Sequence, residues 1–202
     1  MNYNRTRTVQ VFISDQQVQA LGKAFSRVKI DYIYASPLLR AHATGQAVLD
    51  AQPSPQPPFI VNPNLREQYS GIAEGQPALE EIPDGQTAEG LIAKNVFPIL
   101  YSRSAKFPEG ESLDDLARRA DLAITECVLP HVFEDGAHIV IAGHGVCIGE
   151  LIPALLRLDP GSRGDVSYMG LLNTAWTRAT VSVKVSMQLY VCEIKILIYR
   201  VC

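Results

Sequence analysis

The sequence has few of the features that mark metal centres, redox motifs or highly charged partners. Its four cysteines include no Cys-x-x-Cys pair, which argues against a zinc or redox motif and favours a reducing compartment. The four histidines also lack the spacing of metal ligands. A net charge of −3 gives no general electrostatic reason to bind nucleic acid or an anionic membrane. We therefore expect no metal, no cofactor and no nucleic-acid partner.

Long apolar runs are also missing. No stretch approaches the roughly 18 uninterrupted apolar residues of a membrane-spanning helix, and the N-terminus lacks the apolar core of a secretory signal. The expectation is a cytoplasmic protein without a membrane partner. A length of 202 residues suits one domain with a sizeable core, so residues 1–202 are expected to form a single domain.

The sequence does contain strand-like and helix-like segments in alternation, which predicts an α/β fold with a mostly parallel sheet. A Pro- and Gly-rich stretch between them, residues 62–86, is expected to be largely irregular. The expected strands are residues 9–13, 29–35, 59–61, 139–142 and 177–183, and the apolar end of the chain is also β-prone. The expected helices are residues 16–26, 36–49, 87–100, 113–128 and 146–158, the third one broken near Pro98.

Two of these helices carry start signals. The pair Ser36-Pro37 predicts a helix with Ser36 as its N-cap and Pro37 in its first turn. Ser112 is expected to cap the helix over residues 113–128, with Asp115 three residues later as its reciprocal partner.

One histidine stands where a strand meets a helix. His144 lies between Gly143 and Gly145, directly after the apolar residues 139–142. In an open α/β sheet, ligands bind at the carboxyl ends of the strands, where a helix N-terminus presents free N–H groups to an anion. His144 is therefore a candidate anion ligand. The alternative is that the two glycines form a tight turn and that His144 is incidental.

Two further polar residues occupy positions that such a site would use. Arg40 falls in the first turn of the helix that follows Ser36-Pro37, where a planar guanidinium can bind phosphate oxygens. The alternative for Arg40 is an exposed helix arginine. Glu67 lies in the irregular stretch, where a carboxyl group with a raised pKa can protonate a leaving oxygen. The alternative for Glu67 is a solvated loop residue.

Together these residues carry a resemblance to a known family. The segments occur in the order Tyr34-Ala-Ser-Pro-Leu-Leu-Arg-Ala41, Leu65-Arg-Glu-Gln-Tyr-Ser-Gly-Ile-Ala-Glu-Gly75, Pro108-Glu-Gly-Glu-Ser-Leu-Asp-Asp-Leu116 and Ala142-Gly-His-Gly145. This order resembles the histidine phosphatase superfamily, in its phosphoglycerate mutase-like branch. The resemblance runs from about residue 15 to about residue 183. It implies a three-layer sandwich with a mostly parallel central sheet and helices on both faces.

The resemblance also implies a phosphoryl-transfer pocket. In the family, a histidine of an Arg-His-Gly motif attacks phosphorus, a second histidine and arginines hold the oxygens, and a glutamate or aspartate is the general acid. His144 matches the second histidine, Arg40 the second arginine and Glu67 the acid. His144 and Glu67 are thus the expected catalytic residues, and Arg40 and His144 the expected phosphate ligands. A small phosphorylated metabolite or phosphate is the expected ligand.

The Arg-His-Gly motif itself does not occur in the sequence. No other histidine replaces it, because His138 lies at the opposite end of the strand from His144, roughly 20 Å away. His42 is about 200° around its helix from Arg40, and His131 follows the far end of another helix. The family's first strand is therefore expected to be missing or replaced. Residues 1–14 and 184–202 are expected to be atypical ends of a truncated isoform or an imperfect gene model.

These observations predict a phosphatase-type protein for small phosphomonoesters that uses a phosphohistidine mechanism, impaired here because the nucleophilic histidine is absent. Two alternatives remain open. One is a non-catalytic protein that binds phosphate or a partner, and the other is a truncated product without activity.

Overall fold

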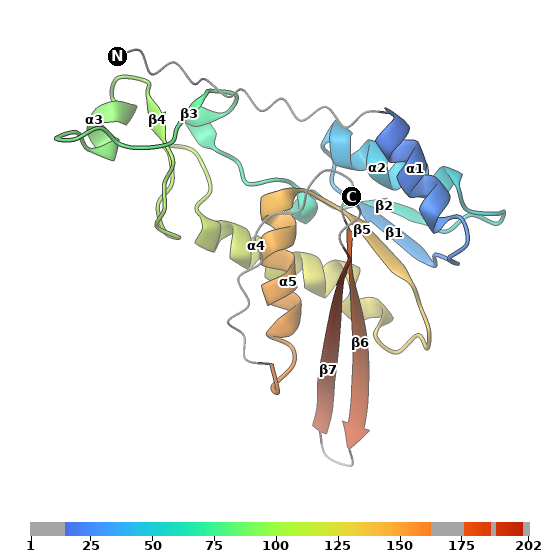
Figure 1. Cartoon of the computed structure of the whole chain (residues 1–202). Coiled ribbons are helices and arrows are strands. Elements are labelled where there is room, and N and C mark those ends of the chain that lie inside the picture. The colour runs from blue at the N-terminus through green and yellow to red at the C-terminus, as the bar shows by residue number, and fades with distance from the viewer. Residues whose placement is uncertain (1–14, 163–175, 187–188, 200–202) are drawn as a thin grey trace. The chain divides into compact units, whose positions relative to one another are not determined.

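A computed structural model describes residues 15–162, 176–186 and 189–199 (Figure 1). The chain divides into two compact units. In the first, the described residues are 68–116, and in the second they are residues 15–67 together with those from Ala117 onward. The single domain expected over the whole chain stays a prediction. Across the described residues, no helix combines the length and the apolar character needed to cross a membrane.

A three-stranded parallel sheet forms the centre of the second unit. Its strand order is β2 (Phe59–Val61), β1 (Tyr32–Ala35) and β5 (Ile139–Ala142). Ala35 is in register with the last residue of each neighbouring strand, so all three carboxyl ends meet at one edge. The predicted α/β fold with a parallel sheet is confirmed.

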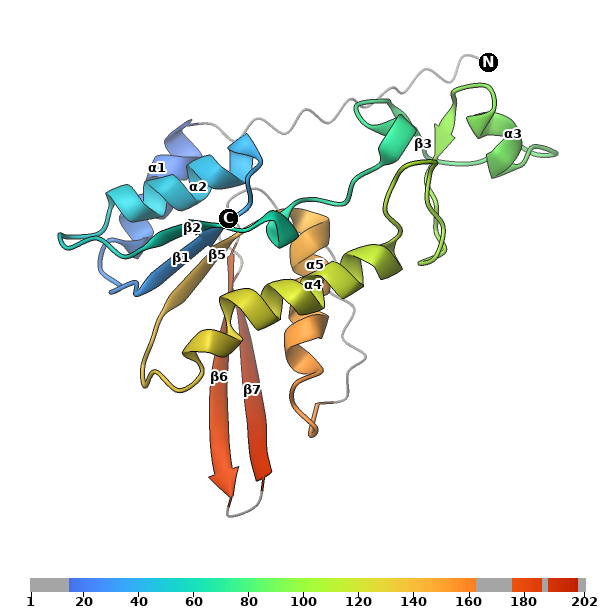
Figure 2. The same ribbon diagram turned by 180° about the vertical axis from the view of Figure 1, so that it is seen from behind.

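One face of this sheet is covered by α2 (Leu39–Asp50), with α1 (Asp15–Phe25) beside it (Figure 2). Ile33 of β1 and Val48 of α2 are buried together in the core between the helix and the sheet. The side chains of a strand alternate between its two faces, and Ile33 lies on the face that α2 covers. At Gly45, an added Cβ would lie 3.0 Å from the Phe59 ring, so the absence of a side chain permits this close packing.

The other face of β1 meets the segment that follows α4 (Leu113–Cys127). Tyr34, which alternates with Ile33, points there, and its hydroxyl lies 2.8 Å from Nε2 of His131 in the short helix η3 (Leu129–His131). Helical segments therefore lie on both faces of the sheet. The second unit also contains α5 (Gly145–Leu156), which begins where β5 ends.

The remaining strands of the second unit form an antiparallel pair, β6 (Trp176–Ser186) with β7 (Leu189–Tyr199). The strand predicted over residues 177–183 is confirmed and extends beyond both predicted ends. The β-prone end of the chain supplies its partner. The strand predicted over residues 9–13 lies outside the described residues. Within the described part of the chain, β5 pairs in its sheet with β1 alone, so the expectation of a missing or replaced first strand stays a prediction.

The first unit is largely irregular, as predicted for its N-terminal part. It holds η2 (Gly71–Ala73), β3 (Ala78–Leu79), α3 (Ala88–Ile92), β4 (Phe97–Pro98) and the start of α4. The helix predicted over residues 87–100 is wrong beyond Ile92. Phe97 and Pro98 pair instead with Ala78 and Leu79 in a short parallel ladder. A proline lacks the N–H that a helix interior needs, which favours this outcome.

The predicted start of α2 is also wrong. The helix begins at Leu39 with Leu38 as N-cap, and no side chain caps it. Ser36 instead extends the sheet, since its N–H donates to the Ala142 carbonyl at 2.9 Å. The residue before a proline is disfavoured in helical conformation, so Ser36 stays extended and Pro37 precedes the helix.

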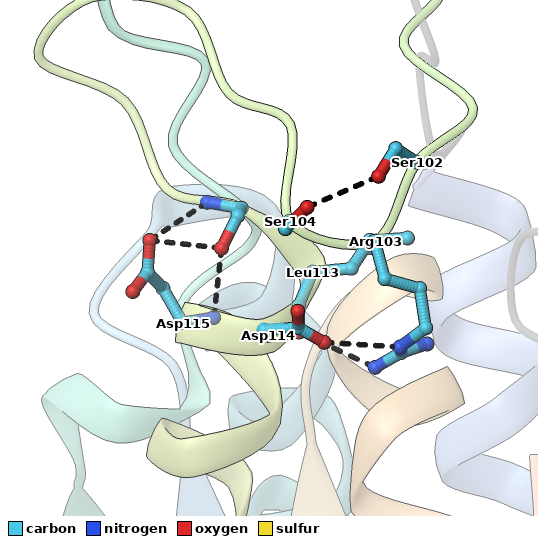
Figure 3. Close-up of polar contacts among 7 residues, drawn as sticks. Ser102, Arg103, Ser104, Leu113, Asp114 and Asp115 are labelled. Carbon is cyan, nitrogen blue, oxygen red and sulfur yellow. Dashed lines mark hydrogen bonds and ion pairs between the residues drawn. The ribbon is translucent and has the colours of Figure 1, made fainter.

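The start of α4 agrees with the prediction (Figure 3). Ser112 Oγ accepts a hydrogen bond from the Asp115 N–H, and Asp115 Oδ2 accepts one from the Ser112 N–H, each at 3.0 Å. The Ser112 N–H and the Lys106 ammonium hold the pKa of Asp115 well below its usual range. This reciprocal pairing satisfies two backbone groups that a helix N-terminus otherwise leaves without partners.

Replacing Ser112 with alanine should lower the free energy of unfolding by about 1 kcal/mol, because it removes an N-cap acceptor. Urea denaturation followed by circular dichroism measures this change. Ser104→Ala is the matched control, since Ser104 lies in the same unit and its hydroxyl contacts only the exposed Ser102 hydroxyl. Equal losses from the two variants would contradict a capping role for Ser112.

Candidate functional site

The candidate site lies at the edge of the sheet where β1, β2 and β5 end together. The chain continues from these strands into Ser36, into residues 62–67 and into Gly143-His144. Arg40 follows Ser36 in the first turn of α2. The parallel register therefore brings the three residues predicted from the sequence, Arg40, Glu67 and His144, to one edge.

His144 is the N-cap residue of α5, and its extended backbone joins the strand to the helix. Its side chain is only 5% exposed, and Nε2 lies 2.8 Å from Ser36 Oγ. Ser36 is itself fully buried. Ser36 is not predicted as a site residue from the sequence, because a Ser-Pro pair also marks helix starts. The signal available was its place directly after a buried strand, the same position that singled out His144.

The surroundings of His144 keep its ring neutral. Burial is the main reason that its pKa falls from 6.5 to about 4, and the positive charges of Arg40 and Arg119 lower the pKa further. Removal from water penalises the charged imidazolium, and like charges nearby penalise it again. At neutral pH the imidazole therefore carries one N–H donor and one lone-pair acceptor.

The second ring nitrogen of His144 is open to a ligand. Nδ1 makes no hydrogen bond to any described residue. No described side-chain nitrogen or oxygen is both fully buried and unpartnered, so Nδ1 is not completely enclosed by protein. Ser36 thus holds one ring nitrogen, and the other has no partner in the described part of the chain.

The Arg40 guanidinium also lacks a partner among the described residues. Arg40 is exposed at the second position of α2, and its guanidinium makes no hydrogen bond or ion pair within the described chain. Its positive charge adds to the lowering of the pKa of His144. An unpaired guanidinium at the same sheet edge as a neutral imidazole provides donors for an oxyanion.

Glu67 occupies the N-terminus of α5. Its Oε1 accepts a hydrogen bond from the Cys147 N–H at 3.0 Å, and its Oε2 accepts one from the Val146 N–H at 3.4 Å. A helix N-terminus favours an anion, and the protein's own Glu67 carboxylate lies at this one. This pairing joins residues about 80 positions apart, and no pattern in the sequence predicts it.

The other three histidines either make contacts of their own or lie at the opposite end of the sheet. The ring of His42 packs against Phe59, with ring centroids 5.0 Å apart. His138 precedes β5, at the end opposite to His144. His131 hydrogen-bonds to Tyr34 and Glu134. The described residues hold no group of three or more His, Cys, Asp or Glu side chains placed to bind a metal ion.

The fold and the site together define an α/β protein that presents a histidine, an arginine and a carboxylate at the carboxyl edge of a parallel sheet. The model of the histidine phosphatase superfamily, branch 1, matches residues 14–184. The chain belongs to this superfamily.

Individual relatives agree with this assignment. The chain is 26% identical over 149 residues to a Yersinia enterocolitica protein named probable phosphoglycerate mutase GpmB, an alignment that covers 73% of this chain and 63% of the relative. Two solved structures share the fold. Mycobacterial hydrolase 1 has a TM-score of 0.63 at 20% identity, with 92% of this chain and 85% of that chain covered. A mycobacterial glucosyl-3-phosphoglycerate phosphatase in complex with VO3 has a TM-score of 0.60 at 22% identity, with 91% and 85% covered. Because the alignments cover 63% and 62% of the curated relatives, the chain spans less than two thirds of their length.

The lowered pKa of His144 makes stability depend on pH. The unfolded chain takes up a proton near pH 6.5, whereas the folded protein does so only near pH 4, so stability falls as the pH drops between these values. Between pH 7 and pH 5 this group should cost about 2 kcal/mol of unfolding free energy. Urea titrations at both pH values, on the natural chain and on His144→Gln, measure the difference. Equal pH dependence in the two proteins would contradict a buried neutral His144.

Proposed function

We propose that this chain binds the phosphoryl group of small phosphomonoesters at the carboxyl edge of its sheet. Arg40 and His144 are the oxyanion ligands in this proposal, and Glu67 is the acid for the leaving oxygen. The proposal extends family membership to this chain's own residues and to a substrate class. The observation that carries it is a pair of groups without partners among the described residues, the exposed Arg40 guanidinium and Nδ1 of His144.

The charge balance of the edge favours an anionic ligand. Arg40 and Arg119 place two positive charges near His144, and these charges add to burial, which is the main cause of its lowered pKa. A bound phosphoryl dianion would offset these charges and favour the protonated imidazole, which then donates a second hydrogen bond. We therefore expect ligand binding to be accompanied by proton uptake at His144.

The Glu67 carboxylate, unlike the Arg40 guanidinium, already has hydrogen-bond partners. In the structure its two oxygens accept hydrogen bonds from the α5 N-terminus, so it is placed as an acceptor. To act as the acid it must carry a proton and turn one oxygen toward the leaving group.

Turnover by this chain should be very weak or absent. The 202 residues contain no Arg-His-Gly sequence, and the other three histidines are held at places away from the site. Fixed cations and donors stabilise the charge of a transferring phosphoryl group, but phosphohistidine chemistry also needs a nucleophilic histidine in line with the leaving oxygen.

A non-catalytic phosphate-binding protein is the second candidate. It is favoured by the same absence of Arg-His-Gly together with the use of Glu67 as a helix-capping acceptor. The two candidates share a ligand and differ in whether a phosphoryl group is transferred.

Removal of the Arg40 guanidinium should weaken vanadate binding. Loss of a charge-assisted hydrogen bond of about 1.5–3 kcal/mol corresponds to roughly a ten- to hundredfold rise in Kd. Isothermal titration of purified chain and of Arg40→Ala with vanadate measures this change. Arg27→Ala is the matched control, because Arg27 is also exposed but lies before β1, at the opposite end of the sheet. Equal weakening by both variants would show a general charge effect and refute the site.

A phosphatase assay with acid-quench trapping of phosphohistidine separates the two candidate functions. We expect hydrolysis of p-nitrophenyl phosphate at or near background and no trapped phosphohistidine. Substantial hydrolysis that is abolished in His144→Ala would overturn the prediction of weak turnover while supporting the assigned site. Vanadate binding without hydrolysis would support the non-catalytic candidate.

A further inference from the structure

A buried arginine connects α4 to the loop that carries Glu67. Arg119 is only 8% exposed and lies in the middle of α4. Its Nη1 donates to the carbonyl oxygens of Asn64 and Arg66, each at 2.8 Å, and its Nη2 donates to the carbonyl oxygen of Glu67 at 3.1 Å. One guanidinium thus binds three of the four carbonyls in residues 64–67.

The same loop is attached to α4 a second time. Glu126 Oε2 accepts hydrogen bonds from the side-chain amides of Asn62 and Asn64, at 2.8 and 2.9 Å. Glu126 follows Arg119 by seven residues, which is about two helical turns, so both side chains leave the same face of the helix. The second attachment holds the start of the loop, and Arg119 holds the end that bears Glu67.

We propose that Arg119 is the positioning residue for Glu67. By fixing the carbonyls of residues 64–67, it holds the Glu67 backbone where the carboxylate meets the N–H groups of Val146 and Cys147. The planar guanidinium suits this task, because it presents several donors in fixed directions. The chemical role of Glu67 as an acid rests on the function proposed above, but its placement by Arg119 does not.

The Cys147 amide reports this placement directly. Its N–H lies in the first turn of α5, where no carbonyl of the helix can accept it, and Glu67 is its acceptor. The Ile148 N–H, one residue later, donates to the His144 carbonyl within the helix at 2.8 Å. Amide hydrogen exchange of Cys147 therefore depends on Glu67, while exchange of Ile148 serves as the internal control.

The test measures amide exchange by NMR on the full chain without ligand. Glu67→Ala should speed exchange at Cys147 by about tenfold, as expected for loss of a hydrogen bond to a charged acceptor. Arg119→Gln should produce a similar increase, and the double variant should show no further change. Arg118→Gln, the same substitution at the exposed neighbouring position, should leave Cys147 unchanged. Ile148 should be unaffected in all of them.

A second variant separates position from charge. Arg119→Lys keeps the positive charge near His144 but lacks the planar set of donors. It should speed exchange at Cys147 while leaving the pKa of His144 near 4, whereas Arg119→Gln should raise that pKa. Arg119→Lys also carries the test if Arg119→Gln does not fold.

Unchanged Cys147 exchange in a folded Arg119→Gln or Arg119→Lys variant, together with a lower melting temperature, would overturn the proposal and leave Arg119 as a packing residue. Effects of Glu67→Ala and Arg119→Gln that add in the double variant would overturn it as well. Because no ligand is present, failure here is distinct from failure to bind vanadate, which tests the proposed function.

Discussion

The candidate site depends on the parallel pairing of β1 with β5. Ala35 and Ala142 are partners in this ladder, and the Ser36 N–H extends it by one more hydrogen bond to the Ala142 carbonyl. This register leaves Ser36 and His144 at the same edge, with 2.8 Å between Oγ and Nε2. A slip of one residue would turn alternate side chains to the other face of the sheet. The Ser36–His144 contact therefore follows from the backbone pairing of the residues next to it.

The N-terminus of α5 imposes a second demand. Its first N–H groups have no acceptor within the helix, and its partial positive charge favours an anion. Glu67 meets two of these groups, and Arg119 holds the loop that brings Glu67 there. The edge then contains the positive Arg40 and Arg119, the negative Glu67 and the neutral His144. The Arg40 guanidinium has no partner among the described residues, which leaves it available to a further anion although one carboxylate is already bound.

Helices and strands whose formation depends on a few neighbouring residues could be predicted from the sequence. The wholly apolar run before His144 identified β5, and the Ser112–Asp115 pair identified the start of α4, because periodicity and capping act over a few residues. Arg40, Glu67 and His144 were proposed as site residues from their positions after strands and within ordered motifs, and their roles stay predictions. Ser36 was misassigned because a Ser-Pro pair marks helix starts often, and only pairing with β5 shows that Ser36 stays extended. The contacts of Glu67 and Arg119 were not predicted, because they join segments about 50 to 80 residues apart in sequence.

Comparison of His131 with His144 shows how the surroundings of a histidine decide what it can do. Both ring nitrogens of His131 are bound by the protein, Nε2 by the Tyr34 hydroxyl and Nδ1 by the Glu134 carboxylate, each at 2.8 Å. Its ring also stacks on Tyr32, with centroids 3.7 Å apart. Both ring nitrogens of His131 thus have protein partners, and neither is left for a ligand. His144 has one nitrogen bound by Ser36, one open nitrogen and two guanidinium charges nearby. A negatively charged ligand would suit such a ring, because it would offset the two guanidinium charges that add to the effect of burial on the pKa of His144.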